Sequence, residues 1–125
     1  MGLTIQNTKF VFRFFEDEFD MICWFFELIH ECAPDYAMAW NYTFDVLYQI
    51  NRLIQHIEKR DMNIRIEDII CDPNIPAKYR TWRFEEDKSP RGEYYSKWHY
   101  FMIPGKTTFI DSMSMYANIR KSKGV

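Results

Sequence analysis

Three cysteines and three histidines are the side chains in this sequence best suited to metal binding or nucleophilic catalysis. Tetrahedral zinc sites use pairs of Cys or His ligands at short fixed spacings, such as Cys-x-x-Cys or His-x-x-x-His. His30 and Cys32 are the closest pair here, and two positions along a helix turn their side chains about 200° apart. We therefore expect neither a metal site nor a cofactor.

A cysteine nucleophile would need a histidine close in space, and Cys71 with His99 is the pairing most compatible with neighbouring strands. A carboxylate pair for acid–base chemistry would be Glu85 with Glu93, on either side of a turn. A buried thiol and solvated carboxylates explain these residues more simply. The sequence therefore predicts no catalytic residues, and we expect a protein that is not an enzyme. An enzyme of unrecognised type would need a pocket that gathers these groups.

Gly105-Lys106-Thr107 matches the end of a phosphate-binding loop. The full motif places another glycine five residues earlier, so that backbone N–H groups can surround the phosphates. Tyr100 occupies that position, and we interpret the segment as a plain turn.

Aromatic and basic side chains are concentrated between residues 77 and 106. The segments 78–86 and 93–103 are typical of strands, and residues 87–92 between them contain the Pro and Gly of a turn. This predicted β-hairpin and its flanks hold eight aromatic residues and seven Lys or Arg residues. Two strands so rich in rings cannot bury all of them in one small core, so we expect some to be exposed.

An exposed surface of rings and cations favours one of two partners. Protein interfaces are enriched in Trp, Tyr, Phe, Met and Arg, whereas nucleic acids are bound by stacked rings and phosphate-neutralising cations. The acidic run Glu85-Glu86-Asp87 would repel a phosphate backbone. We therefore expect a larger protein partner, with a nucleotide or a single-stranded nucleic acid as the alternative, and core packing as the competing explanation for most of the rings. The predicted binding residues are Arg80, Trp82, Arg83, Tyr94, Tyr95, Lys97 and Trp98.

Two helices are predicted in the N-terminal half, after a segment at 9–15 that favours a strand or a backward extension of the first helix. The first helix begins at the acidic cluster 16–20 and ends near Cys32, with two apolar stripes that predict burial on two sides. The second runs from about Tyr36 to Arg60, and the short link between them favours an antiparallel pair. Its predicted inner face consists of Tyr36, Trp40, Phe44, Leu47, Ile50, Ile54 and Ile57.

Beyond Asp61 the apolar residues alternate, which predicts a strand at 62–66, and two prolines make 72–76 a loop. A helix is expected over 108–121, with a final strand near 112–115 as the alternative. The predicted fold is a single globular domain, 1–125, of α+β class: an antiparallel sheet of three to four strands with a two-helix hairpin packed on one face and a C-terminal helix.

Net charge, cysteine count and charge distribution limit the partners and the cellular location that we expect. The net charge of −2 is too small to indicate a strongly charged partner. An odd number of cysteines without disulfide-domain spacing, and no signal-peptide pattern, predict a cytoplasmic protein with reduced thiols. Seven charges within residues 10–32 argue against a membrane span there.

The composition is typical of small inhibitors, immunity proteins and accessory proteins of phages or mobile elements. These bind a larger protein without catalysis. Association with further copies of the chain is left open, because self-association would also bury surplus rings.

Overall fold

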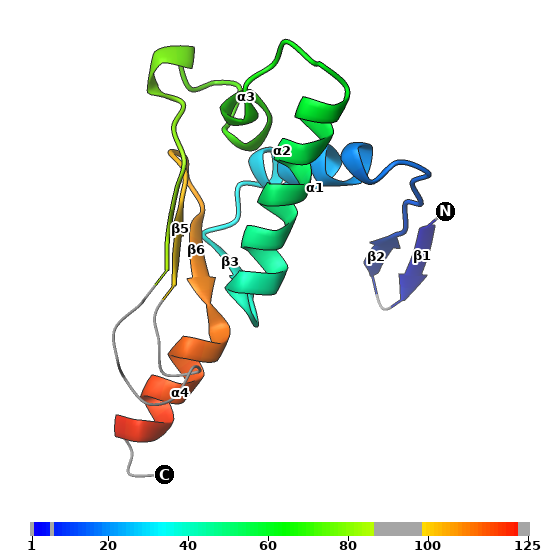
Figure 1. Ribbon diagram of the computed structural model, residues 1–125. Coiled ribbons are helices and arrows are strands. Elements are labelled where there is room, and N and C mark those ends of the chain that lie inside the picture. Colours follow the sequence, from blue (N-terminus) through cyan, green and yellow to red (C-terminus); the bar gives the residue numbers. More distant parts are fainter. Residues whose placement is uncertain (1, 6, 87–98, 123–125) are drawn as a thin grey trace.

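A computed structural model of the chain describes residues 2–5, 7–86 and 99–122 (Figure 1). An N-terminal hairpin, β1 (Gly2–Ile5) and β2 (Thr8–Val11), precedes α1 (Glu18–Cys32) and β3 (Tyr36–Ala39). A π-helical segment, Thr43–Leu47, continues into α2 (Tyr48–Lys59), and the short α3 (Ile66–Ile70) and a 3-10 turn (Ala77–Tyr79) follow. The last elements are β4 (Arg83–Glu85), β5 (Tyr100–Met102), β6 (Thr108–Asp111) and α4 (Ser112–Ser122).

The mixed helix and strand content confirms the predicted α+β class, but the predicted sheet is wrong. Within the described residues the strands form three two-stranded ladders, and the pair β3–β6 is parallel rather than antiparallel. Strands β5 and β6 lie side by side without a ladder between them (Figure 1). Pro104, which lacks an amide hydrogen, and Gly105, at a φ of 153°, form the sharp connection that separates these two strands.

Helix α1 has the start and stop signals that the sequence indicates. The Asp17 side chain accepts a hydrogen bond from the Phe19 amide at 3.0 Å, which caps the first turn. At the other end Ala33 adopts a left-handed conformation and donates its amide to the Ile29 carbonyl at 2.8 Å, and Pro34 prevents continuation.

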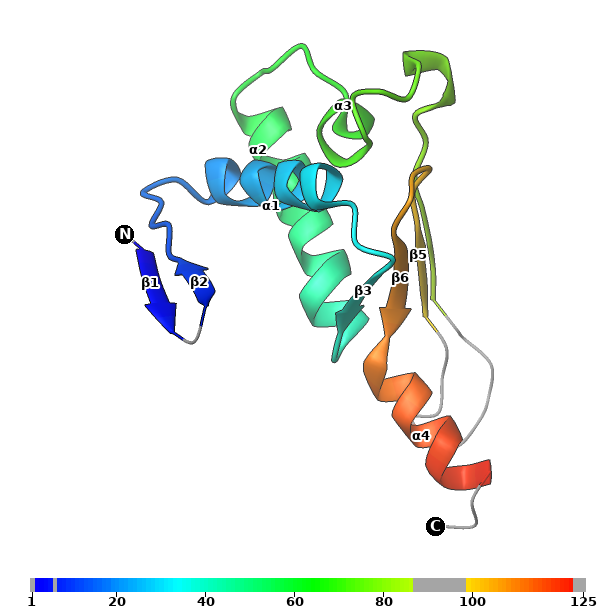
Figure 2. The ribbon, with the colours of Figure 1, turned by 180° about the vertical axis from the view of Figure 1, so that it is seen from behind.

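The predicted second helix begins about seven residues too early. Tyr36–Ala39 pairs as strand β3 with Thr108–Asp111, because a ladder to a distant strand overrides the local helical period. The side chains of Tyr36, Trp40 and Phe44, predicted to face inward, are 57–67% exposed. Ile50 and Leu53 in α2 are fully buried. With β3 between the two helices, α1 crosses α2 instead of forming a tight antiparallel hairpin with it (Figures 1 and 2).

Two further predictions are corrected downstream. No strand forms at 62–66: the chain turns at Asp61, in the left-handed region with a φ of 49°, and enters α3 at Ile66. The C-terminal helix starts at Ser112, after strand β6, and its first turn is capped by the buried Asp111 carboxylate, which accepts hydrogen bonds from the Met113 and Ser114 amides.

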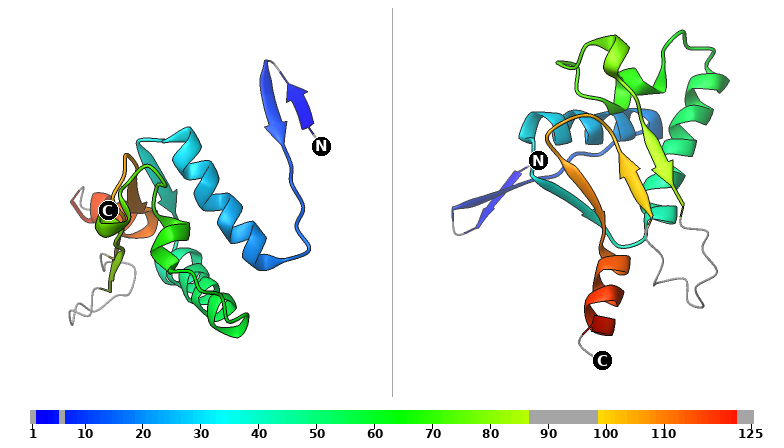
Figure 3. Two further views of the ribbon diagram at one scale, coloured as in Figure 1. Left: turned by 90° about the horizontal axis from the view of Figure 1, so that it is seen from above. Right: turned by 90° about the vertical axis from the view of Figure 1, so that its left-hand side faces the viewer.

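The core lies between the helices and the β3, β5 and β6 strands. It is small for the number of apolar residues present, and its fully buried members are Ile22, Phe26, Tyr42, Ile50, Leu53, Ile70, Cys71 and Phe101. Two ion pairs and a hydrogen bond hold the N-terminal end of α1 against α2. Glu18 accepts from Arg52 at 2.7 Å and from His56 at 2.9 Å, and Asp17 accepts from Arg60 at 2.6 Å. The N-terminal hairpin, β1 and β2, projects away from the helices and the other strands (Figure 3).

Candidate functional site

The predicted aromatic hairpin is confirmed as an antiparallel pair in its described part, although its strands are shorter than expected. Arg83 lies opposite Met102, Phe84 opposite Phe101 and Glu85 opposite Tyr100. Four of the predicted binding residues, Tyr94, Tyr95, Lys97 and Trp98, lie outside the described residues.

The two faces of this pair differ in burial. Phe84 and Phe101 face inward, and the Phe101 side chain is 2% exposed. Trp82 is half-buried and packs against the core. Tyr100 and Met102 are 49% and 45% exposed, so the outer face is mixed in character. The described rings therefore divide between core and surface.

Arg80 and Arg83, both predicted binding residues, have partners within the chain. The Arg80 guanidinium donates to the Ile75 carbonyl at 2.8 Å, the Pro73 carbonyl at 3.0 Å and the Asp68 carboxylate at 3.0 Å. Arg83 is exposed and forms an ion pair with Glu85. Arg80 thus holds the proline-containing loop 72–76 in place, and the predicted role of Arg80 and Arg83 in partner binding stays a prediction.

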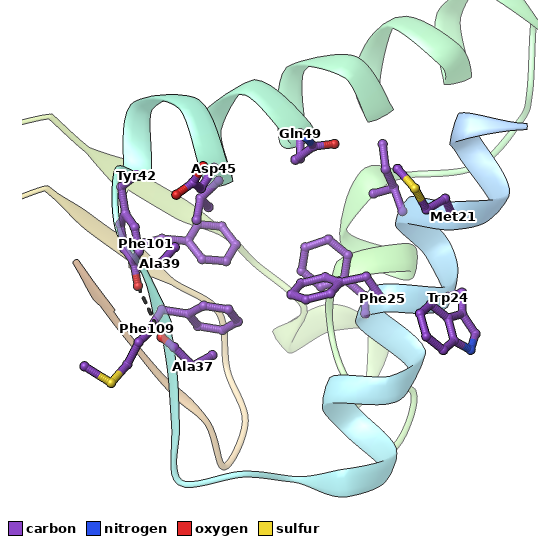
Figure 4. A pocket seen from close by; sticks show the side chains of 14 residues that line it. Met21, Trp24, Phe25, Ala37, Ala39, Tyr42, Asp45, Gln49, Phe101 and Phe109 are labelled. Atoms are coloured by element: carbon purple, nitrogen blue, oxygen red, sulfur yellow. Dashed lines mark hydrogen bonds between the residues drawn. The ribbon is translucent and has the colours of Figure 1, made fainter. Parts of the chain in front are cut away.

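A second surface, which the sequence did not single out, is an apolar cleft between α1 and the strands (Figure 4). The cavity within it has a volume of about 370 Å³. Helix α1 supplies one wall, β3 with the start of the π-helical segment supplies another, and the rings of Phe101 and Phe109 form the floor. Asp45 is the one charged residue of the lining, and the remaining members are Met21, Ile22, Trp24, Phe25, Phe26, Ala37, Met38, Ala39, Tyr42, Val46 and Gln49.

The rim of this cleft is apolar as well. On α1, Met21 and Phe25 are 43% and 46% exposed, and Leu28 on the following turn is 37% exposed. Across the cleft Met38 is 54% exposed. A close-packed interior leaves few voids larger than a water molecule, so an open cavity with exposed apolar walls is a place where another molecule can bind.

The sequence signal for this surface is an apolar stripe of α1 that helical periodicity predicts to be buried. Met21, Phe25, Leu28 and Cys32 form the second apolar stripe of α1, from which burial on two sides was expected. The structure buries Ile22 and Phe26 from the other stripe and leaves the second stripe partly exposed. Periodicity identifies an apolar helix face and does not tell whether this chain or a partner covers it.

Cys71, Cys23 and His30 make contacts within the protein, and Glu93 lies outside the described residues. The Cys71 thiol donates to the Thr81 carbonyl at 3.3 Å, and burial raises its pKa. Burial, reinforced by Glu27 and Asp20, raises the pKa of Cys23 to about 11. Both thiols are therefore protonated near neutral pH, which disfavours a nucleophilic role. His30 donates to the Ile70 carbonyl at 2.7 Å and so ties α1 to α3.

Within the part of the chain that the structure describes, no three Cys, His, Asp or Glu side chains gather as metal ligands would. No helix among the described residues combines the length and apolar character needed to cross a membrane.

No protein-family model matches the chain, and neither a curated protein nor a solved structure is significantly similar to it. The function must therefore be inferred from the surface itself.

Proposed function

We propose that this chain is a non-enzymatic protein-interaction module that binds a larger protein partner, in the manner of small inhibitors, immunity proteins and accessory proteins. The observation that carries the proposal is the open apolar cleft between α1 and β3, flanked by the partly exposed side chains of Met21, Phe25 and Met38. Its residue types, Met, Phe and Trp, are those enriched at protein interfaces.

A polypeptide fits this surface better than a small molecule does. The cavity volume is within the range of small-ligand sites, but such sites combine apolar walls with several convergent polar groups. Here Asp45 and Gln49 are the clearly polar members of the lining. Asp45 already accepts a hydrogen bond from the Asn41 amide at 2.9 Å. The apolar surface also continues beyond the cavity to Leu28, which favours an extended or helical segment laid along it.

The alternative, binding of a nucleotide or a single-stranded nucleic acid through the aromatic hairpin, has weaker support. Such binding needs cations free to neutralise phosphates. Of the predicted cationic residues that are described, Arg80 donates to three groups of its own chain and Arg83 pairs with Glu85. If the alternative is correct, oligonucleotides will bind at low salt and be released steeply as salt is added.

The test is a comparative capture from the native host. Wild-type protein, Phe25→Asp and Met38→Asp are immobilised in parallel, and the retained proteins are identified. Phe44→Asp is the matched control, because Phe44 is 67% exposed and does not line the cleft. We expect at least one protein to be retained by the wild type and the control and lost from both cleft variants.

A buried charge at an interface centre typically weakens binding by more than about 2 kcal/mol, which makes this loss easy to detect. Each variant is first compared with the wild type by circular dichroism and thermal unfolding, so that loss of the fold is not mistaken for loss of the surface. If every captured protein is retained equally by all four samples, the cleft is not the binding surface.

A further inference from the structure

Strand β3 has one paired edge and one open edge. Its partner β6 lies beside β5, which pairs with β4, so β3 is the outermost strand of this group (Figure 3). Among the described residues, no strand pairs with the other side of β3. This open edge borders the apolar cleft described above, since Ala37, Met38 and Ala39 all contribute to the lining. An open edge can accept a further strand from another molecule.

The register of the β3–β6 ladder shows which backbone groups are available at that edge. Tyr36 is opposite Thr108, and the Thr108 amide donates to the Asp35 carbonyl at 2.9 Å. Backbone groups of successive residues in a strand point to opposite sides, so those of Ala37 also face β6. The N–H and C=O groups of Tyr36 and Met38 therefore point away from β6, and within the described part of the chain no backbone group pairs with them. They offer two donors and two acceptors to an added strand.

The residues of β3 do not protect this edge. Proteins commonly protect an edge strand with charged side chains, a proline or a bulge. The four residues Tyr36–Ala39 include neither a charged residue nor a proline, and they pair with β6 without a break in register. The side chains of Tyr36 and Met38 are 63% and 54% exposed. The edge thus combines open hydrogen-bonding groups with apolar contact area.

The charges around this edge favour a basic segment. Asp35 directly precedes β3 and is exposed, and Asp45, also exposed, lies in the lining of the cleft. Neither Lys nor Arg occurs between residues 14 and 51, the stretch that contains α1, β3 and the π-helical segment. A second copy of this chain would bring the same two carboxylates to the same edge, and like charges oppose such pairing. A segment with Lys or Arg on either side of its apolar residues complements the edge.

We infer that the cleft and the open edge of β3 together bind an extended segment of the partner, with apolar residues at alternate positions and basic residues at its ends. This inference rests on the proposed function and specifies the conformation and charge of the segment that is bound. The segment adds a strand to β3 through the backbone groups of Tyr36 and Met38. Because successive side chains of a strand point to opposite faces, one set of alternate residues enters the cleft, where Phe25 of α1 lies, and the other set faces solvent.

Amide hydrogen exchange of the full chain, followed residue by residue with NMR, tests the inference. The probe is a synthetic peptide in which Val alternates with Thr and a Lys stands at each end. Main-chain hydrogen bonds provide the affinity in strand addition, so a peptide of this pattern is a sufficient probe. In the free protein we expect fast exchange at Tyr36 and Met38 and slower exchange at Ala37 and Ala39. Excess peptide should slow exchange at Tyr36 and Met38 by at least about tenfold.

N-methylated peptides separate strand addition from other modes of binding. One version carries methyl groups on all its Val amides and the other on all its Thr amides, so each lacks donors along one edge. A strand pairs with β3 through one of its edges. We therefore expect one version to bind like the parent peptide and the other at least about tenfold more weakly.

Substitutions in the chain test the contribution of the cleft and of its charge. Phe25→Asp should weaken peptide binding, whereas Phe44→Asp, outside the cleft, should leave it unchanged. Replacing both Lys residues of the peptide by Glu should weaken binding by about threefold or more. Asp45→Asn should reduce this difference between the two peptides, because it removes the carboxylate of the lining.

Three results would overturn the inference: no peptide binding, binding that leaves exchange at Tyr36 and Met38 unchanged, and equal binding of the two methylated versions. If exchange at these residues is already slow in the free protein and becomes faster on dilution, a second copy occupies the edge and the inference also fails. The capture experiment is independent. A partner lost from both cleft variants supports the cleft even when the peptide does not protect β3, and protection by the peptide supports the open edge even when the capture finds no partner.

Discussion

Phe101 and Phe109 meet edge to face, with ring centroids 4.8 Å apart and planes inclined by 81°. This contact joins strand β5 to strand β6, which share no ladder, and the two rings form the floor of the apolar cleft (Figure 4). Core packing and the candidate binding surface thus depend on the same pair of side chains.

Removal of one ring of this pair should destabilise the fold. Phe101 is 2% exposed, and replacement of a buried phenylalanine by alanine typically lowers the free energy of unfolding by about 3–5 kcal/mol. The matched control is Tyr100→Ala on the same strand, where the side chain is 49% exposed and the expected loss is under about 1 kcal/mol. Urea unfolding followed by circular dichroism measures both. Equal losses would show that β5 does not pack as described.

The contacts between α1 and α2 should make stability depend on pH in acid. Hydrogen bonds from His56 and Arg52 lower the pKa of Glu18 below its ordinary value of 4.5. A carboxyl group whose pKa is lower in the folded state stabilises the fold above its unfolded pKa, and that stabilisation is lost as the pH falls through the folded pKa. We therefore expect the urea midpoint of the wild type to fall more steeply below pH 4.5 than that of Glu18→Gln.

Glu58→Gln is the control for this titration, because Glu58 is an exposed carboxylate on α2. Its acid profile should follow the wild type. If Glu18→Gln and the wild type lose stability in parallel through this range, the bonds to Arg52 and His56 contribute nothing to folding.

The parts of the fold that the sequence predicts are those determined by nearby residues. Helix α1 is one, since Asp17 caps its start and Pro34 follows its end. The antiparallel pairing of β4 with β5 is another, since both strands flank one turn-forming segment. By contrast, the parallel pairing of Tyr36–Ala39 with Thr108–Asp111 joins distant segments, and no local pattern specifies it.

The candidate site illustrates the same limit. The sequence predicts the apolar stripe of α1 that contains Met21 and Phe25. Whether this stripe is exposed depends on how closely β3 and β6 approach it. They leave a cleft instead, so Met21 and Phe25 remain partly in solvent. The predicted role of Trp82 as a partner anchor stays a prediction, and its half-buried position makes a fold measurement essential in any test of it.

The three thiols should react at different rates with a thiol reagent. Cys32 is exposed at the end of α1, whereas Cys71 is buried and donates to the Thr81 carbonyl. Cys23 is intermediate in exposure, and burial raises its pKa to about 11, so little reactive thiolate is present at pH 8. With a chromogenic disulfide reagent we expect one fast thiol in the native protein and three in urea. Cys32→Ser should remove the fast phase; a fast phase that persists in this variant would place another thiol at the surface.

Substitution of Arg80 tests whether this residue supports the fold or serves only a partner. Its guanidinium donates to two carbonyl groups of the loop 72–76 and to Asp68, and lysine cannot reproduce this forked arrangement. We expect Arg80→Ala and Arg80→Lys each to lower the free energy of unfolding by about 2 kcal/mol, since hydrogen bonds to charged groups contribute on that scale. Arg83→Ala, at an exposed ion pair, should change it by less than about 1 kcal/mol. If Arg80→Ala unfolds like the wild type and loses only partner binding in the capture experiment, Arg80 belongs to the interface and the loop is held by other contacts.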